Sequence, residues 1–96
     1  MEQSVALLEV QALVAAIAGL DAMLKAASVR LIHIERRLGG RLVTVVVDGE
    51  LSAVAAALEA GREAASKVGK VKLSGVIARP HPEILKFLHT DDIDTP

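Results

Sequence analysis

The sequence predicts an α+β fold, a ferredoxin-like βαββαβ sandwich with a short C-terminal helix. Three observations lead to this prediction. The chain has 96 residues, which suits one domain with one hydrophobic core. Segments with strand and helix periodicity follow one another as strand, helix, strand, strand, helix and strand. Gly39 and Gly40 separate the two adjacent strands, as in a hairpin.

The first two elements are an apolar strand over residues 4–10 and an alanine-rich helix over residues 11–27. Asp21 and Lys25 are the only charges of this helix, one turn apart on one face. A surface helix normally has a solvated polar face, but here small apolar residues occupy that position. Either the helix is buried in its own domain, or a neighbouring subunit covers its second side.

The hairpin follows, with strands over residues 28–38 and 41–47 on either side of the two glycines. Residues 48–50 (Asp-Gly-Glu) close the second strand. Strict alternation in the first strand predicts two opposite faces, one with Val29, Leu31 and His33, and the other with Arg30, Ile32, Ile34 and Arg36.

The second half of the chain contains a helix over residues 51–68, capped by Gly69, and a strand over residues 71–78. Pro80 ends the strand, because proline cannot donate to a β-ladder. Pro82 can begin a short helix, over residues 82–88.

Composition excludes several function classes. A formal net charge of -1 gives no broad electrostatic reason to bind nucleic acid or an anionic membrane. Phe87 is the single aromatic residue, so a base-stacking platform is absent, and a chain without cysteine has no disulfides or thiolate metal sites. The N-terminus lacks the features of a signal peptide, and no apolar run reaches the ~20 residues of a membrane span. We expect a cytoplasmic protein.

No catalytic site is predicted, and we expect no enzyme activity, cofactor or metal. His33, His81 and His89 share no metal-ligand spacing. An acylphosphatase-like hydrolase needs an asparagine, which the sequence lacks. In contrast, the hydrophobic share of 52% is more than so short a chain can bury alone. Part of the apolar surface is therefore expected at subunit interfaces.

Four stretches occur together in a characteristic order: DAMLKAA from Asp21, LGGR from Leu38, LVTVVVDGE from Leu42, and IARPH from Ile77. In combination they resemble the bacterial microcompartment shell proteins of the single-domain, hexamer-forming type. The resemblance covers residues 5–88 and places the shell domain over residues 3–88, followed by a flexible acidic tail over residues 89–96.

This resemblance implies a non-enzymatic tile. Members of the family form six-fold discs that join edge to edge into a shell around enzymes, together with other shell proteins. Small metabolites cross the shell through a pore on the six-fold axis. By this comparison the pore is lined by Leu38, Gly39, Gly40 and Arg41, and the hexamer–hexamer edge carries Asp21, Lys25, Arg79 and His81.

The hairpin departs from the family pattern, which reads K-I-G-S-G before the V-T-V strand. This chain has one extra residue there, so either the preceding strand is bulged or the loop is longer. Six copies of Arg41 around the axis are expected to favour anionic metabolites. Alternatively, Arg41 turns away and pairs with Asp48 or Glu35 of a neighbour. The end of the strand, Asp48-Gly49-Glu50, also replaces the common R-G-D and reverses a charge.

The sequence leaves two questions open. The compartment can be a carboxysome or a metabolosome, and the hexamers can be pure or mixed. The alternative function is a small regulatory domain of the same fold that binds a metabolite between subunits. Such a domain would normally be attached to an enzyme, for which this chain has no room.

Overall fold

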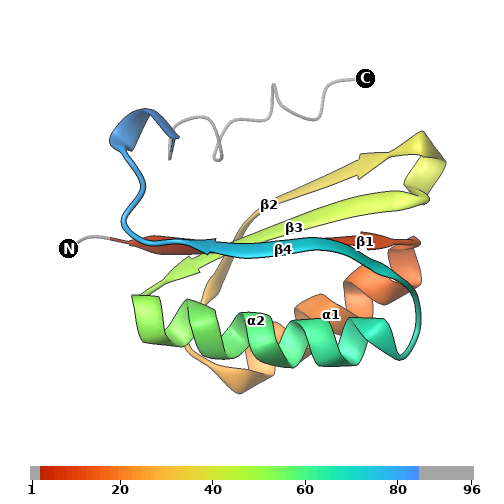
Figure 1. The fold of residues 1–96 in the computed structure, drawn as a ribbon, viewed down its shortest axis with the longest axis horizontal. Helices are drawn as coiled ribbons and strands as arrows, with labels where there is room; N and C mark the ends of the chain where they lie inside the picture. The colour runs from red at the N-terminus through yellow and green to blue at the C-terminus, as the bar shows by residue number, and fades with distance from the viewer. Residues whose placement is uncertain (1–2, 85–96) are drawn as a thin grey trace.

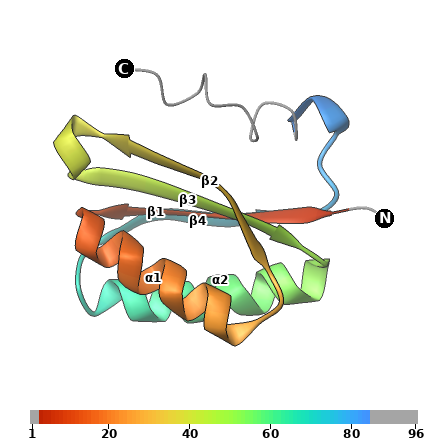
Figure 2. The ribbon, with the colours of Figure 1, turned by 180° about the vertical axis from the view of Figure 1, so that it is seen from behind.

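The computed structural model describes residues 3–84, which form a four-stranded antiparallel sheet with two helices on one face (Figure 1). The strand order β2-β3-β1-β4 confirms the predicted βαββαβ arrangement. Figure 2, from behind, shows both helices on the same side of the sheet. The elements are β1 (Ser4–Gln11), α1 (Leu13–Ala26), β2 (Arg30–Arg37), the 3-10 turn η1 (Leu38–Gly40), β3 (Leu42–Gly49), α2 (Leu51–Ser66) and β4 (Val71–Ile77).

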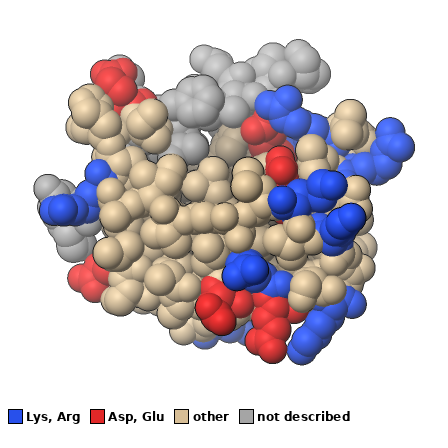
Figure 3. Space-filling view, in the orientation of Figure 1, with Lys and Arg blue, Asp and Glu red and all other residues tan. Residues whose placement is uncertain are grey.

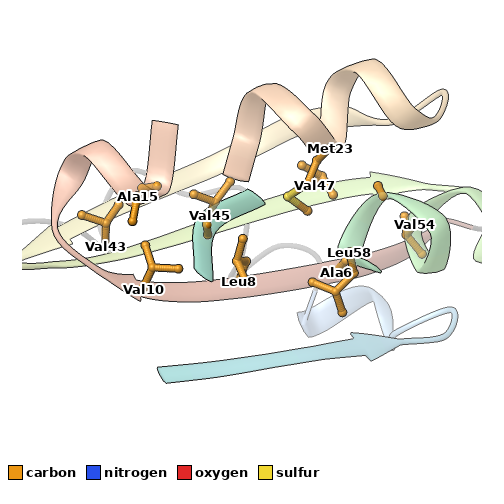
Figure 4. Packing of buried hydrophobic residues seen from close by; sticks show 13 residues of the cluster. Ala6, Leu8, Val10, Ala15, Met23, Val43, Val45, Val47, Val54 and Leu58 are labelled. Carbon is orange, nitrogen blue, oxygen red and sulfur yellow. The ribbon is translucent and has the colours of Figure 1, made fainter. Parts of the chain in front are cut away.

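The hydrophobic core lies between the sheet and the two helices. Successive side chains of a strand point to opposite faces, so alternate residues of β1 and β3 face the helices. Figure 4 shows these side chains meeting Met23 and Ala15 of α1 and Leu58 and Val54 of α2. The sheet contributes Ala6, Leu8, Val10, Val43, Val45 and Val47 to this core.

The two helices cross at a pair of glycines. A Cβ atom on Gly61 would lie 2.5 Å from Cγ of Met23 and 3.2 Å from the carbonyl oxygen of Gly19. A Cβ on Gly19 would lie 2.9 Å from Cδ2 of Leu8. The absence of side chains at these positions therefore lets α1 and α2 approach each other and the sheet closely.

Helix α1 begins at Leu13, two residues later than predicted, because Gln11 still pairs with Leu42 in the sheet. The helix is not buried in its own domain. Val14 is 66% exposed and Ile17 is 54% exposed, while Leu13 and Leu24 are also exposed. The first of the two predicted explanations for its apolar surface is therefore wrong for the single chain.

A β-bulge in β2 changes the predicted faces of that strand. Leu31 pairs with Val47 and His33 pairs with Val46, which leaves Ile32 as the extra residue. Ile32 consequently packs on the helix-free face of the sheet, whereas Ile34 packs against the core under the helices. The prediction that these two isoleucines share a face was wrong, because strict alternation cannot anticipate a bulge.

The C-terminal side of the domain is described as far as Ile84. Helix α2 ends at Ser66, and Gly69 is not a left-handed cap, because only Gly39 and Gly40 have positive φ among the described glycines. A helical turn occupies residues 82–84. The rest of the predicted helix over residues 82–88, and the predicted tail over residues 89–96, lie outside the described residues.

Candidate functional site

The hairpin tip is built from three consecutive residues in the left-handed region. Leu38, Gly39 and Gly40 have φ values of 55°, 67° and 89°. A Cβ atom on either glycine would meet nothing within 4 Å, so glycine is favoured here by the backbone conformation and not by lack of space. Leu38 is 65% exposed, and the tip projects beyond the helices at one end of the molecule (Figure 1).

Arg41 closes the tip. Its backbone N–H donates to the carbonyl oxygen of Leu38 at 3.3 Å, and its side-chain Nε donates to the same oxygen at 3.1 Å. The guanidinium is exposed and remains beside the predicted pore residues. The four residues predicted to line a pore therefore lie together at one exposed turn.

The two carboxylates considered as alternative partners of Arg41 already have partners within the chain. Asp48 accepts hydrogen bonds from Nη2 of Arg30 at 2.9 Å and from Nε at 3.2 Å. Glu35 forms an ion pair with Arg37. Pairing of Arg41 with either acid would thus compete with an existing ion pair.

The predicted edge residues lie at the other end of the domain. The exposed side chains of Lys25 and Asp21 form an ion pair of 3.0 Å on the C-terminal half of α1. The backbone N–H of Arg79 donates to Oγ of Ser4 at 3.2 Å, and Nδ1 of His81 accepts from the backbone N–H of Glu83 at 3.1 Å. In Figures 1 and 2 the C-terminal ends of α1 and β4 both lie opposite the hairpin tip.

The ion pair between Arg30 and Asp48 was not predicted. Asp48 is 2% exposed, and its hydrogen bonds and opposite charge raise the pKa of the Arg30 guanidinium above its ordinary value. The pair lines an open hollow of about 550 Å³, together with Gln3, Ser28 and Glu50. Arg30 and Asp48 are opposite each other in the β2–β3 register. The reversed charge at Asp48 was the sequence signal that could have indicated a cationic partner.

Within residues 3–84, no group of three histidine, aspartate or glutamate side chains is placed to hold a metal ion. In the same part of the chain, neither α-helix has the length and apolar character needed to cross a membrane.

Comparison with known proteins gives a consistent result. The family model of the BMC domain matches residues 4–80 of this sequence. The chain is 45% identical over 87 residues to the bacterial microcompartment shell protein PduA of Citrobacter freundii, covering 91% of this chain and 92% of that protein. It is 47% identical over 87 residues to the major carboxysome shell protein CsoS1 of Prochlorococcus marinus, covering 90% and 84% of the two chains.

A solved structure extends the comparison to the fold. The crystal structure of a microcompartment protein from Desulfitobacterium hafniense superposes with a TM-score of 0.80 at 29% sequence identity. The alignment covers 100% of this chain and 50% of that chain, so this chain spans half the length of the protein in that structure.

Proposed function

Because the chain belongs to the BMC domain family, whose curated relatives are bacterial microcompartment shell proteins, we propose that it forms cyclic hexamers that tile into such a shell in the cytoplasm. The shell role is structural, and the relatives are shell proteins and not enzymes. Other shell proteins are the remaining partners of these hexamers.

The exposed apolar face of α1 is the observation that carries this proposal. Leu13, Val14, Ile17 and Leu24 are all at least 38% exposed in the single chain. A contiguous apolar surface on a small domain favours a protein–protein interface. A second copy of the chain is the proposed occupant, and the flat dimensions of 34 × 30 × 17 Å suit a tile.

The hairpin tips converge on the six-fold axis in the proposed hexamer. Gly39 and Gly40 allow six backbones to approach without Cβ clashes. Two Arg41 charges about 10 Å apart repel by only about 0.4 kcal/mol in water, so a hydrated ring is tolerable. An anion on the axis is attracted by all six charges, and the proposed pore therefore favours small anionic metabolites.

The opposite end of each subunit forms the rim of the disc. Lys25 and Arg79 have long aliphatic stems that can pack across a join while their charged groups reach carbonyls or carboxylates of the next disc. Asp21 forms an exposed ion pair with Lys25 on α1, and Arg79 and His81 follow the end of β4.

Assembly tests the tile. Light scattering behind size exclusion should give the mass of six chains, and electron microscopy should reveal sheets or tubes. Lys25→Ala and Arg79→Ala should retain the hexamer and lose the extended sheets. A monomer at micromolar concentration contradicts the proposal, as does a dimer that needs a small ligand, while sheets from both variants contradict the rim assignment.

Passage through reconstituted shells tests the pore. Arg41→Ala should lower the ratio of anion flux to neutral-solute flux, because it removes the charge nearest the axis. Lys25→Gln is the control, because it removes the same charge far from the tip. It is measured in mixed shells, in which parent chains maintain the sheets. An unchanged flux ratio in Arg41→Ala would exclude anion selection by this residue.

A further inference from the structure

Some cationic side chains of the domain form ion pairs with carboxylates, and others do not. The described ion pairs are Lys25–Asp21, Arg30–Asp48 and Arg37–Glu35. At the end that carries the hairpin tip, five cationic side chains have no carboxylate within ion-pair distance among residues 3–84. This set, called the basic end, consists of Arg36, Arg41, Lys67, Lys70 and Lys72.

Backbone contacts place the two segments of the basic end, the hairpin tip and the α2–β4 connection, on either side of Gln11 and Ala12. Consecutive N–H groups connect its two segments, since Gln11 donates to the carbonyl oxygen of Lys70 at 2.8 Å and Ala12 donates to that of Arg41 at 3.0 Å. A Cβ atom on Gly69 would lie 2.7 Å from the carbonyl oxygen of Gln11. The α2–β4 connection is therefore packed tightly against the start of α1, beside the hairpin.

The surface view agrees with this arrangement. Figure 3 shows Lys and Arg side chains gathered over the end of the molecule where Figure 1 places η1, the α2–β4 connection and the start of β4. Lys67, Lys70 and Lys72 are exposed. None of these lysines belongs to the predicted pore or to the predicted edge.

We propose that the basic ends of six subunits form a collar around the pore mouth and that this collar binds small molecules that carry an oligophosphate chain. The inference rests on the hexamer and axial tip proposed above. Arg41 and Lys70 flank the Gln11–Ala12 segment on its two sides, so a hexamer with the tip on its axis has Lys67 and Lys70 in a wider ring around it. Lysine ammonium groups on flexible stems bind phosphate as point charges.

The collar selects for several charges on one ligand. A single exposed charge contact is weak in water, so a ligand must meet several lysines at once to bind tightly. An oligophosphate chain has closely spaced negative charges that can do so, whereas a monocarboxylate cannot. Because no aromatic residue occurs in residues 3–84, the phosphate chain and not a nucleobase is the recognised group.

Titration calorimetry of the assembled hexamer with tripolyphosphate tests the collar. We expect one tripolyphosphate per six chains and much weaker binding of orthophosphate. Lys70→Gln should weaken binding about threefold or more, and Lys67→Gln/Lys70→Gln about tenfold or more. The difference in affinity between parent and variants should become smaller as salt is added. Lys70→Gln keeps the backbone carbonyl that Gln11 contacts. Arg62→Gln, which removes one exposed charge from α2 outside the basic end, is the control and should bind like the parent.

The outcomes separate the collar from the tile. Hexamers that do not bind tripolyphosphate, or that bind it equally well in Lys67→Gln/Lys70→Gln, overturn the collar and leave the tile intact. A stoichiometry of one tripolyphosphate per chain would show that each subunit has its own site and would overturn a site shared by six subunits. If a DNA oligonucleotide binds more tightly than tripolyphosphate at equal phosphate concentration, the proposal that the ligand is a small molecule is overturned. Failure to form hexamers, measured separately by light scattering, overturns the tile.

Discussion

Ala12 has the most demanding backbone of the residues that position the tip. Its φ of 79° and ψ of 141° form a combination that favours glycine strongly over residues with a Cβ. The conformation persists because Ala12 and Gln11 donate to the two segments of the basic end. The hydrogen bonds that connect hairpin, helix and final strand are therefore maintained against local strain.

Ala12→Gly should relieve this strain. We expect a gain of about 1 kcal/mol in the free energy of unfolding, after the larger entropy of glycine in the unfolded chain is subtracted. Ala55→Gly, at an exposed position inside α2, should instead lose up to about 1 kcal/mol. Urea denaturation at one fixed chain concentration measures both. A loss in both variants would show that Ala12 is not strained.

The Arg30–Asp48 pair gives a second prediction for single residues. Arg30→Ala leaves the buried carboxylate of Asp48 without its partner and should lower the urea midpoint clearly. Arg30→Ala/Asp48→Ala removes both charges and should recover part of the loss. If the double variant is less stable than Arg30→Ala, the pair is not the cause.

The raised pKa of Arg30 fixes the sign of the pH dependence. A group whose pKa is higher in the folded chain stabilises the fold fully below its unfolded pKa and ceases to do so only above its folded pKa. For an arginine both values lie above the usual experimental range. The difference between parent and Arg30→Ala should therefore be constant between about pH 7 and pH 9.

The elements of the fold could largely be predicted from apolar periodicity, because that pattern reflects which face of each helix or strand is buried. The bulge in β4 could not be predicted, and a bulge in β2 was expected only as one of two alternatives for the extra residue relative to the family pattern. Ile32 in β2 and Lys72 in β4 are the residues without a partner in the sheet register. Gly69 is likewise explained by its distance from Gln11, a contact between residues far apart in sequence. Such features depend on tertiary contacts that no local pattern encodes.

Both bulges lie in edge strands, since β2 and β4 are the outer strands of the sheet. A bulge interrupts the row of free backbone groups that would otherwise pair with a strand from another molecule. We therefore expect subunits to associate mainly through side-chain packing and not through a continuous β-sheet.

The crossing of α1 and α2 is expected to be intolerant of added volume. Gly61→Ala places a methyl group against Met23 and the carbonyl of Gly19, which should cost about 1–3 kcal/mol despite the better helix propensity of alanine. Gly75→Ala in β4, where a Cβ would meet nothing within 4 Å, is the matched control and should be nearly neutral. Thermal or urea unfolding distinguishes the two, and equal stability would show that Met23 repacks without cost.

At the scale of the whole molecule, the excess of apolar residues indicated partners, but the sequence did not show which side of α1 faces them. Two faces of α1 are apolar, so only the folded structure shows which face is buried and which is exposed. Ala16 and Met23 are fully buried, and Val14 and Ile17 are exposed. The tip and edge residues were predicted from a resemblance to a family, whereas the basic end depends on contacts between distant segments.

This division of α1 allows folding and assembly to be tested separately. Ile17→Glu changes an exposed position and should give a folded chain that fails to form hexamers, because the interface would bury an unpaired carboxylate. Ala16→Glu introduces the same carboxylate into the core and should prevent folding. Circular dichroism reports folding and light scattering reports mass. Hexamers of Ile17→Glu would place the interface elsewhere.

The placement of both helices on one face of the sheet has a consequence for the orientation of the tile. Rotation about a single axis cannot exchange the two sides of a disc, so the proposed cyclic hexamer has two different sides. If the sheet lies in the plane of the disc, one side is covered by helices and the other is bare sheet. A shell made of such discs presents different chemistry to its lumen and to the cytoplasm. A disc inserted in the inverted orientation would occupy the same position in the shell, but its opposite side would face the lumen.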